Sequence, residues 1–212
     1  LKTTVVRMPI RQIKDQDDLS KSHCDWLVSR FKNVVVIEKD MSSVLESFEK
    51  CLSAEEMTGL SLANTRSRLR MTMLYQIASV NSGIVVGTGN KVEDFGIGFF
   101  TKYGDGGVDI SPIADLMKSE VRELCSEMGV LKEIVLAPPT DGLWDDGRTD
   151  EDQIGLTYDQ LEWAMETLDR PTRALTEDEK SVVKKYLKVR SPNLHKMRPI
   201  PICKMKGTLD ES

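Results

Sequence analysis

Short apolar runs alternate with helical patterns along this chain, and the alternation predicts an α/β protein. Residues 3–6 form a β-prone run, and residues 34–37 form a continuous apolar run typical of a strand covered on both faces. A third apolar run, residues 84–86, stops abruptly at Gly87. Strands separated by helices indicate an open, mostly parallel sheet with helices on both faces, built as one domain over residues 1–212.

Several segments carry helix signals. Acidic residues at positions 15–18 suit the amino end of a helix, and apolar residues recur at helical spacing over residues 117–128, before Gly129. Capping boxes of the form Ser/Thr-x-x-Glu/Gln predict further helix starts at Ser43, Ser53, Thr157 and Thr176. Residues 141–154 are rich in Asp, Glu and Gly, so we expect a mobile loop or lid there.

The helix expected over residues 60–80 is apolar on two neighbouring stripes. One stripe holds Leu62, Leu69, Met73, Ile77 and Val80, and the other holds Met71, Leu74 and Ala78. A helix that is apolar on two sides needs either a deep core or a partner subunit. The pattern alone leaves both open.

Composition excludes some classes of partner. The chain has 212 residues, 40% of them hydrophobic and 30% charged, which is ordinary for a globular domain. Its formal charge of −5 gives no electrostatic reason to bind nucleic acid or an anionic membrane. The four cysteines are scattered and there are two histidines, which argues against a zinc site and favours reduced thiols. With no signal peptide and no long apolar run, we expect a cytoplasmic protein.

The candidate chemistry lies in residues 87–109, GTGNKVEDFGIGFFTKYGDGGVD. This stretch directly follows the third apolar run and combines carboxylates, glycines, two phenylalanines and a lysine. In an α/β sheet, the carboxyl end of a strand is the expected position for a ligand-binding loop. A glycine-rich connecting loop with ordinary solvated charges is the alternative.

The order of residues in this stretch resembles the NAD synthetases. The resemblance rests on GT-x4-E followed by GFFTKYGDGG-x-D, and it extends from Asn64-x3-Arg68-x-Arg70-Met71 to His195-Lys196. It implies a Rossmann-like fold of the kind that binds adenine nucleotides, and a homodimer paired through residues 60–80. It also implies ATP-dependent amidation of nicotinic acid adenine dinucleotide to NAD through an acyl-adenylate. The lack of a glutaminase domain favours free ammonia as the nitrogen donor.

One departure from the family pattern concerns the amino end. The glycine-rich ATP loop SGGxDS is absent from this sequence, whose first segment resembles the second sheet strand of the family. We therefore expect either a preceding segment of several tens of residues or a shortened form, and we expect the 212-residue chain alone to be inactive. A non-catalytic dimeric nucleotide-binding protein and a GMP synthetase-like ligase are the alternative functions.

The resemblance also implies roles for individual residues. Mg²⁺ would be held by Glu93, five residues after Thr88. Asp105 would deprotonate ammonium, and Lys118 would assist catalysis, although by themselves they would suggest an Asp-Gly turn and a surface lysine. ATP would contact Thr88, Lys118 and Thr140. The dinucleotide substrate would contact Asn64, Arg68, Lys102, Asp109, His195 and Lys196. For Asp94 we expect a helix-start or solvated charge.

Overall fold

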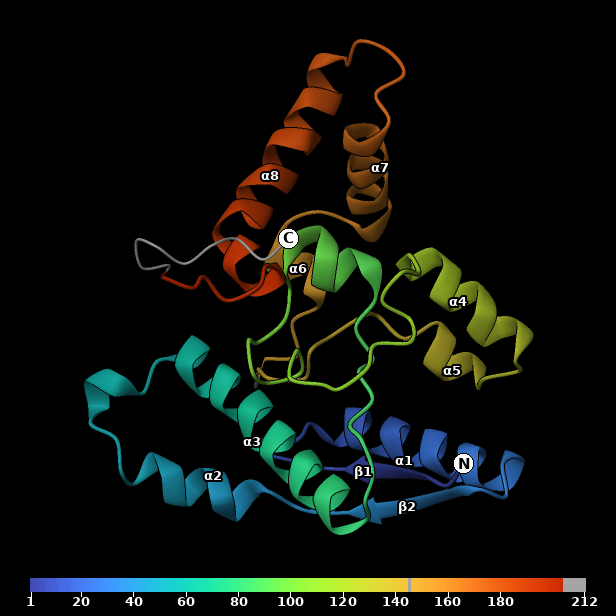
Figure 1. Cartoon of the computed structure of the whole chain (residues 1–212), viewed down its shortest axis with the longest axis vertical. Coiled ribbons are helices and arrows are strands. Elements are labelled where there is room, and N and C mark those ends of the chain that lie inside the picture. The colour runs from blue at the N-terminus through green and yellow to red at the C-terminus, as the bar shows by residue number, and fades with distance from the viewer. Residues whose placement is uncertain (145, 204–212) are drawn as a thin grey trace.

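The computed structural model describes residues 1–144 and 146–203. Two parallel strands, β1 (Thr3–Arg7) and β2 (Val34–Glu38), pair in the register Thr3↔Val34 to Arg7↔Glu38. Helix α1 (Lys14–Arg30) joins them and packs against both. These elements lie at one end of the molecule with α2 (Ser42–Glu49) and α3 (Gly59–Val80), while α7 (Tyr158–Asp169) and α8 (Glu177–Met197) form the other end (Figure 1). The α/β class predicted from the sequence is confirmed.

Most of the predicted helices form. The two-stripe pattern becomes α3, and the periodic segment before Gly129 becomes α4 (Lys118–Glu127). The capping boxes at Ser53, Thr157 and Thr176 are present, the first opening the short helix η1 (Ala54–Glu56). The box predicted at Ser43 is wrong, because α2 begins one residue earlier. The buried Met41 fixes that start by donating its backbone N–H to the Pro9 carbonyl at 2.9 Å.

The third predicted strand is wrong as a sheet strand. Among the described residues, this segment makes one isolated parallel bridge, Val86↔Ile110, and no strand besides β1 and β2 enters the sheet. Only Val85 of the run is buried, since Ile84 and Val86 are exposed. An apolar run shows that a segment can be extended but not which neighbour it pairs with. The expected cover on both faces is also wrong for β2, where Val35 is exposed.

The acidic segment 141–154 is only partly a loop. Its last residues form helix α6 (Asp150–Ile154), opened by a capping box at Thr149 and ended by Gly155 in the left-handed region. Ile154 is buried in the main core, which the acidic composition did not indicate. A second short helix, α5 (Lys132–Val135), follows α4.

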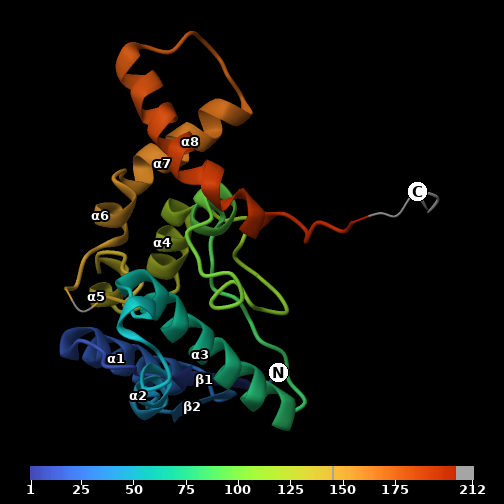
Figure 2. The ribbon, with the colours of Figure 1, turned by 90° about the vertical axis from the view of Figure 1, so that its left-hand side faces the viewer.

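Two apolar clusters hold the molecule together. The larger lies between α7, α8 and the π-helix η2 (Lys91–Ile97). Figure 2 shows α7 and α8 next to each other at one end of the molecule. The larger cluster contains Val92, Ile97, Ile154, Leu156, Tyr158, Leu161, Ala164, Val183 and Tyr186. The smaller joins Ile10, Met41 and Leu45, with Leu69 and Met73 of α3 packed against them. No helix in the described ranges combines the length and the apolarity that crossing a bilayer requires.

Candidate active site

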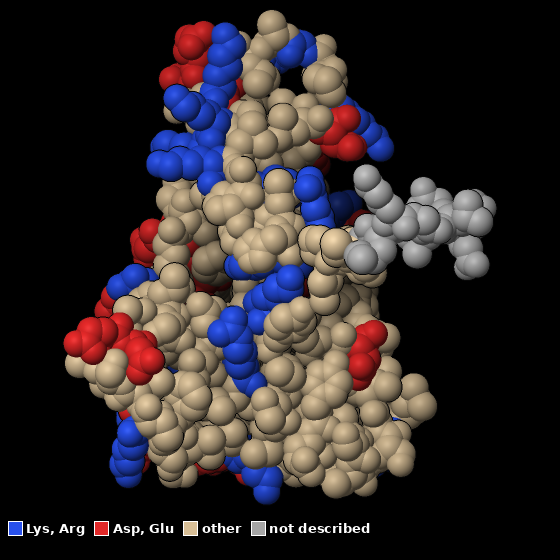
Figure 3. All heavy atoms as spheres, turned by 60° about the vertical axis from the view of Figure 1, so that its left-hand side comes forward, with Lys and Arg blue, Asp and Glu red and all other residues tan. Residues whose placement is uncertain are grey.

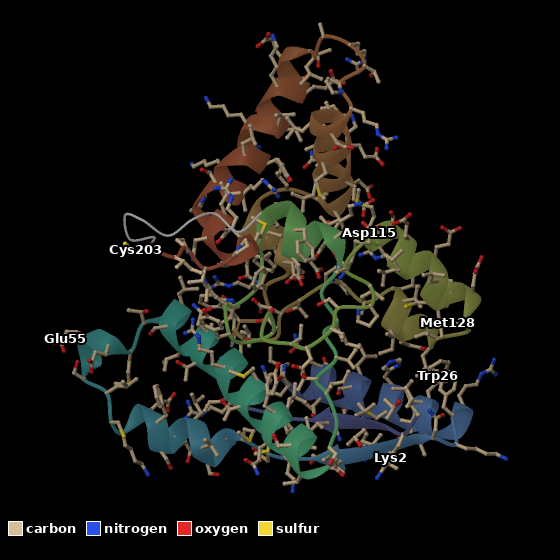
Figure 4. The ribbon with its side chains drawn as sticks, viewed as in Figure 1. Lys2, Trp26, Glu55, Asp115, Met128 and Cys203 are labelled. Carbon is tan, nitrogen blue, oxygen red and sulfur yellow. The ribbon has the colours of Figure 1, made fainter. Side chains whose placement is uncertain are left out.

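Part of the glycine-rich stretch forms the π-helix η2, whose first turn carries the carboxylates of Glu93 and Asp94. Asn90 caps it, its Oδ1 accepting the backbone N–H groups of Val92 and Glu93, both at 3.0 Å. Gly98 ends it in the left-handed region at φ 66°. Val92 and Ile97 are buried in the main core, so Glu93 is left free to line a cavity. An ion pair of 2.9 Å between Lys91 and Asp115 ties its start to the segment before α4; Asp115 is labelled there in Figure 4.

Glu93 is the centre of a polar cluster built from three other elements. Its Oε1 accepts a hydrogen bond from Lys118 Nζ of α4 at 2.8 Å and one from the Tyr158 hydroxyl of α7 at 2.6 Å. The same hydroxyl lies 3.0 Å from Asp150 Oδ2 of α6. Burial, followed by the charge of Glu93, raises the pKa of Tyr158, so the hydroxyl stays protonated. One proton is therefore shared between two carboxylates.

Asp150 is the more buried of these carboxylates. The residue is 6% exposed, and burial raises its pKa to about 6, against a lowering effect of the Tyr158 hydrogen bond. Its Oδ1 is buried without a hydrogen-bond partner among the described residues. Asp150 faces the same cavity as Glu93 and Lys118.

Asp105 is held by the helix that lies beneath the glycine loop. Its Oδ1 accepts the Ser67 hydroxyl at 2.6 Å and the Thr101 backbone N–H at 3.0 Å, and its own N–H donates to Ser67 Oγ at 2.9 Å. Gly104 permits this approach, because a Cβ there would lie 2.2 Å from Ser67 Oγ. The side chain of Asp105 is therefore held in one orientation by Ser67 and Thr101, which a simple Asp-Gly turn would not require.

Three adjacent cavities meet at Asp105, which lines all of them. The first, about 450 Å³, is lined by Glu93, Lys118 and Thr140. The second, about 480 Å³, is lined by Asn64, Arg68, Lys102, His195 and Lys196. The third, about 300 Å³, is lined by Thr88. Of the residues expected near ATP, Lys118 and Thr140 share the first cavity and Thr88 lines the third, whereas five of the six residues expected near the dinucleotide line the second.

The second cavity is basic. Lys and Arg side chains gather between α3 and α8 on the face shown in Figure 3, and Arg68, Lys102 and Lys196 belong to the cavity lining. Lys196 Nζ donates to the carbonyls of Gly98 at 2.9 Å and Phe100 at 2.7 Å, and burial lowers its pKa. These three cations suit the pyrophosphate group of a dinucleotide.

Two acidic residues differ from their expected surroundings. Asp109 lines none of the three cavities; its carboxylate accepts the Val85 N–H at 2.7 Å and the Tyr75 hydroxyl at 3.1 Å, which fixes residues 84–86 in place. Asp94 was expected at a helix start or as a solvated charge; it lies in the first turn of η2, so the helix start is confirmed, but its charge is not solvated. Its half-buried carboxyl group is pressed against Gly89, and burial, with the charges of Asp105 and Glu93, raises its pKa to about 7.

Sequence reasoning gave no role to Ser67, Asp150 and Tyr158. A serine among the apolar stripes of α3 is a signal that could have identified Ser67. Asp150 had no comparable local signal, since an acidic loop is an ordinary place for a carboxylate. Tyr158 lies in the segment Thr157-Tyr158-Asp159, which falls at the spacing of the family, but that match assigned it no role. Their role comes from chain segments that meet only in the folded structure.

Comparison with known proteins decides the family. A family model described as NAD synthase matches residues 1–200. The chain belongs to the NAD synthase family. The NH(3)-dependent NAD(+) synthetase of Mesoplasma florum is 40% identical over 161 residues, covering 75% of this chain and 63% of that protein. The chain spans about half to nearly two thirds of the length of several curated relatives in this family.

Solved NAD synthase family structures share the fold. The NMN synthetase of Francisella tularensis superposes with a TM-score of 0.81 at 29% identity, over 97% of this chain and 80% of that one. The NH3-dependent NAD synthetase of Campylobacter jejuni superposes with a TM-score of 0.71 at 23% identity, over 95% and 77% of the two chains. The Rossmann-like α/β fold implied by the sequence is thereby confirmed.

Proposed function

We propose that this protein amidates nicotinic acid adenine dinucleotide to NAD, using ATP and ammonia and releasing AMP and pyrophosphate. The observation that carries the proposal is the position of Asp105 where the cavities meet. One cavity offers Lys118 and Glu93 for a metal-bound triphosphate, and the next offers Arg68, Lys102 and Lys196 for a dinucleotide. A nicotinate carboxylate and the α-phosphorus of ATP would meet between them.

In the first step, a nicotinate oxygen attacks the α-phosphorus and the bond to pyrophosphate breaks. Negative charge accumulates on phosphate oxygens, and the Lys118 ammonium, which lines the first cavity, would neutralise it. Lys118 is held by Glu93 at 2.8 Å, so its position is fixed before the nucleotide binds. The acyl-adenylate that results has AMP as its leaving group.

Magnesium is the cation that the family implies, and the donors here suit it. Mg²⁺ takes carboxylate oxygens together with substrate phosphates, and Glu93 lines the cavity beside a buried carboxylate oxygen of Asp150 that has no partner in the described part of the chain. Glu93 would hold the ion, which when bound supplies positive charge to the phosphates. No group of three or more His, Cys, Asp or Glu side chains that could hold a metal ion occurs among the described residues.

In the second step, ammonia attacks the acyl carbon and the bond to AMP breaks. Ammonium must first lose a proton, because only neutral ammonia is nucleophilic. Both hydrogen bonds that the Asp105 carboxylate accepts from the described residues end on Oδ1, so Oδ2 is available to take this proton. Ser67 and Thr101 thereby orient Asp105 without blocking it.

A second substrate has specific support. The Francisella tularensis neighbour is an NMN synthetase, so the mononucleotide is the second candidate. Because we expect the 212-residue chain alone to be inactive, both substrates are tested on a longer polypeptide that also carries the ATP loop, with ATP, Mg²⁺, ammonium chloride and one substrate, and NAD or NMN is measured by mass spectrometry. Trp144 lines the second cavity and gives a fluorescence signal for binding without turnover. Formation of NMN without NAD would favour the mononucleotide as the substrate. The proposal would be refuted if no product formed and the dinucleotide showed no saturable binding.

We also infer a homodimer formed through α3. The end of α3 and the extended segment after it expose Val80, Ile84 and Val86, which are 72%, 60% and 52% exposed, and Ile110, which bridges Val86, is 45% exposed. Exposed apolar side chains gathered in this way would suit an interface with a second copy of the chain. Sedimentation should give about twice the 23.9 kDa mass of the chain. A monomer at micromolar concentration would refute this interface.

The cytoplasmic location stays a prediction, in keeping with four free cysteines.

A further inference from the structure

Asp150 has no role in the steps described above, although its surroundings are unusual for a carboxylate. The residue is 6% exposed, and its Oδ1 has no hydrogen-bond partner in the ranges that the structure describes. A buried charged oxygen without a partner is costly and calls for a cation or a donor that binds there. Asp150 lines the cavity that also contains Glu93.

Helix capping does not explain the carboxylate. Asp150 is the first residue of α6, but the capping interactions belong to its neighbours. Thr149 Oγ1 accepts the Asp152 N–H at 3.1 Å, and Asp152 Oδ2 accepts the Thr149 N–H at 3.0 Å. The side chain of Asp150 points instead to the Tyr158 hydroxyl, 3.0 Å away.

Tyr158 fixes the spacing between Asp150 and Glu93. The Tyr158 hydroxyl lies 2.6 Å from Glu93 Oε1 and 3.0 Å from Asp150 Oδ2. Tyr158 itself is only 2% exposed and belongs to the larger apolar cluster. Lys118 forms an ion pair with Glu93 at 2.8 Å, whereas no Lys or Arg in the described ranges forms one with Asp150. The carboxylates of Glu93 and Asp150 thus share the hydroxyl proton of Tyr158, and in the described ranges only Lys118 forms an ion pair with either of them.

We propose that Asp150 is the second carboxylate of the divalent-cation site, and that Tyr158 is the positioning residue that holds it beside Glu93. A hard cation such as Mg²⁺ binds carboxylate oxygens directly or through its own water molecules, and Oδ1 of Asp150 is such an oxygen. The site would then have anionic ligands from η2 and α6, both anchored by one buried side chain of α7. This inference rests on the proposed function only for the identity of the cation.

Terbium luminescence tests the site without turnover. Tb³⁺ is a hard cation that emits when an excited tyrosine lies nearby, so the 212-residue chain is titrated with Tb³⁺ alone and then with competing Mg²⁺. Asp150→Asn and Glu93→Gln should each weaken Tb³⁺ binding by about tenfold. Asp159→Asn, on an exposed neighbour of Tyr158, should leave it unchanged. Tyr158→Phe should remove most of the sensitised emission and serves as a second variant if Asp150→Asn does not fold.

The outcomes separate this inference from the proposed function. Normal binding in Asp150→Asn, with weakened binding in Glu93→Gln, would overturn the role of Asp150 and leave the amidation reaction standing. Absence of any Mg²⁺-competed emission from the unsubstituted chain would overturn the cation site as a whole. The amidation reaction itself is judged separately, by the product assay.

Discussion

Replacing Asp94 with asparagine should stabilise the metal-free protein, and by an amount that depends on pH. The carboxyl group is half-buried against Gly89, and no hydrogen bond from the described residues reaches it. Its pKa rises from 3.8 to about 7, mainly by burial. Asparagine has the same shape and removes the charge that burial opposes.

The size of the stabilisation expected for Asp94→Asn follows from the raised pKa of Asp94. A pKa difference of roughly three corresponds to about 4 kcal/mol, and partial exposure to solvent reduces this to about 2 kcal/mol. Because folding raises the pKa, the protonated acid is favourable below about pH 4, and this advantage is lost as the pH rises to about 7. The stabilisation by Asp94→Asn should therefore be near zero at about pH 4 and complete at about pH 8.

Urea unfolding in the presence of EDTA measures this difference. The free energies of unfolding of Asp94→Asn and the unsubstituted chain are compared across the pH range, with the exposed Asp159→Asn as the control. The control should show no pH-dependent gain. A variant that is no more stable than the original at about pH 8 would refute the account, because the buried charge would then carry no cost.

Three further outcomes are expected. In a longer polypeptide that also carries the ATP loop, Glu93→Gln should slow pyrophosphate release by about a hundredfold and recover partly at high Mg²⁺, whereas a normal rate would exclude Glu93 from the metal site. Asp105→Asn should keep pyrophosphate release but slow amide formation, and an equal loss of both would contradict its role in the ammonia step. Gly98→Ala should lower the free energy of unfolding by about 2 kcal/mol in urea titration. The reason is that φ is 66° there and the new Cβ would lie 2.7 Å from the Cβ of Asn193, so an unchanged midpoint would show that the loop can shift.

Local signals predicted the helices well and their mutual arrangement poorly. Periodicity and capping boxes identified α3, α4, α7 and α8, because these signals lie within one turn or one face of each helix. The run at residues 84–86 was assigned to a sheet strand wrongly, since hydrophobicity does not specify a pairing partner. Its pairing depends on Asp109, whose carboxylate accepts the Val85 N–H.

The candidate site shows the same division. The glycine-rich stretch and its residue types were visible in the sequence, whereas the assignment of residues to ATP or to the dinucleotide came from the family resemblance and stays a prediction. Tyr158 lies 65 positions from Glu93, and no pattern within either segment announces that they touch. Asp94 was misjudged for a related reason, because its burial comes from the way the glycine loop folds back over Gly89.

Tyr158 belongs both to the apolar core and to the polar cluster around Glu93, so the packing of the core and the spacing of the carboxylates depend on the same side chain. Its ring packs with Leu161 and Tyr186, while its hydroxyl lies between two carboxylates. Repacking the interior to raise thermal resistance would tilt that ring and change the distance between the charges it separates. If the proposed cation site is correct, variants that gain heat tolerance through α7 should also change their affinity for Mg²⁺, and cation binding should be measured alongside thermal stability.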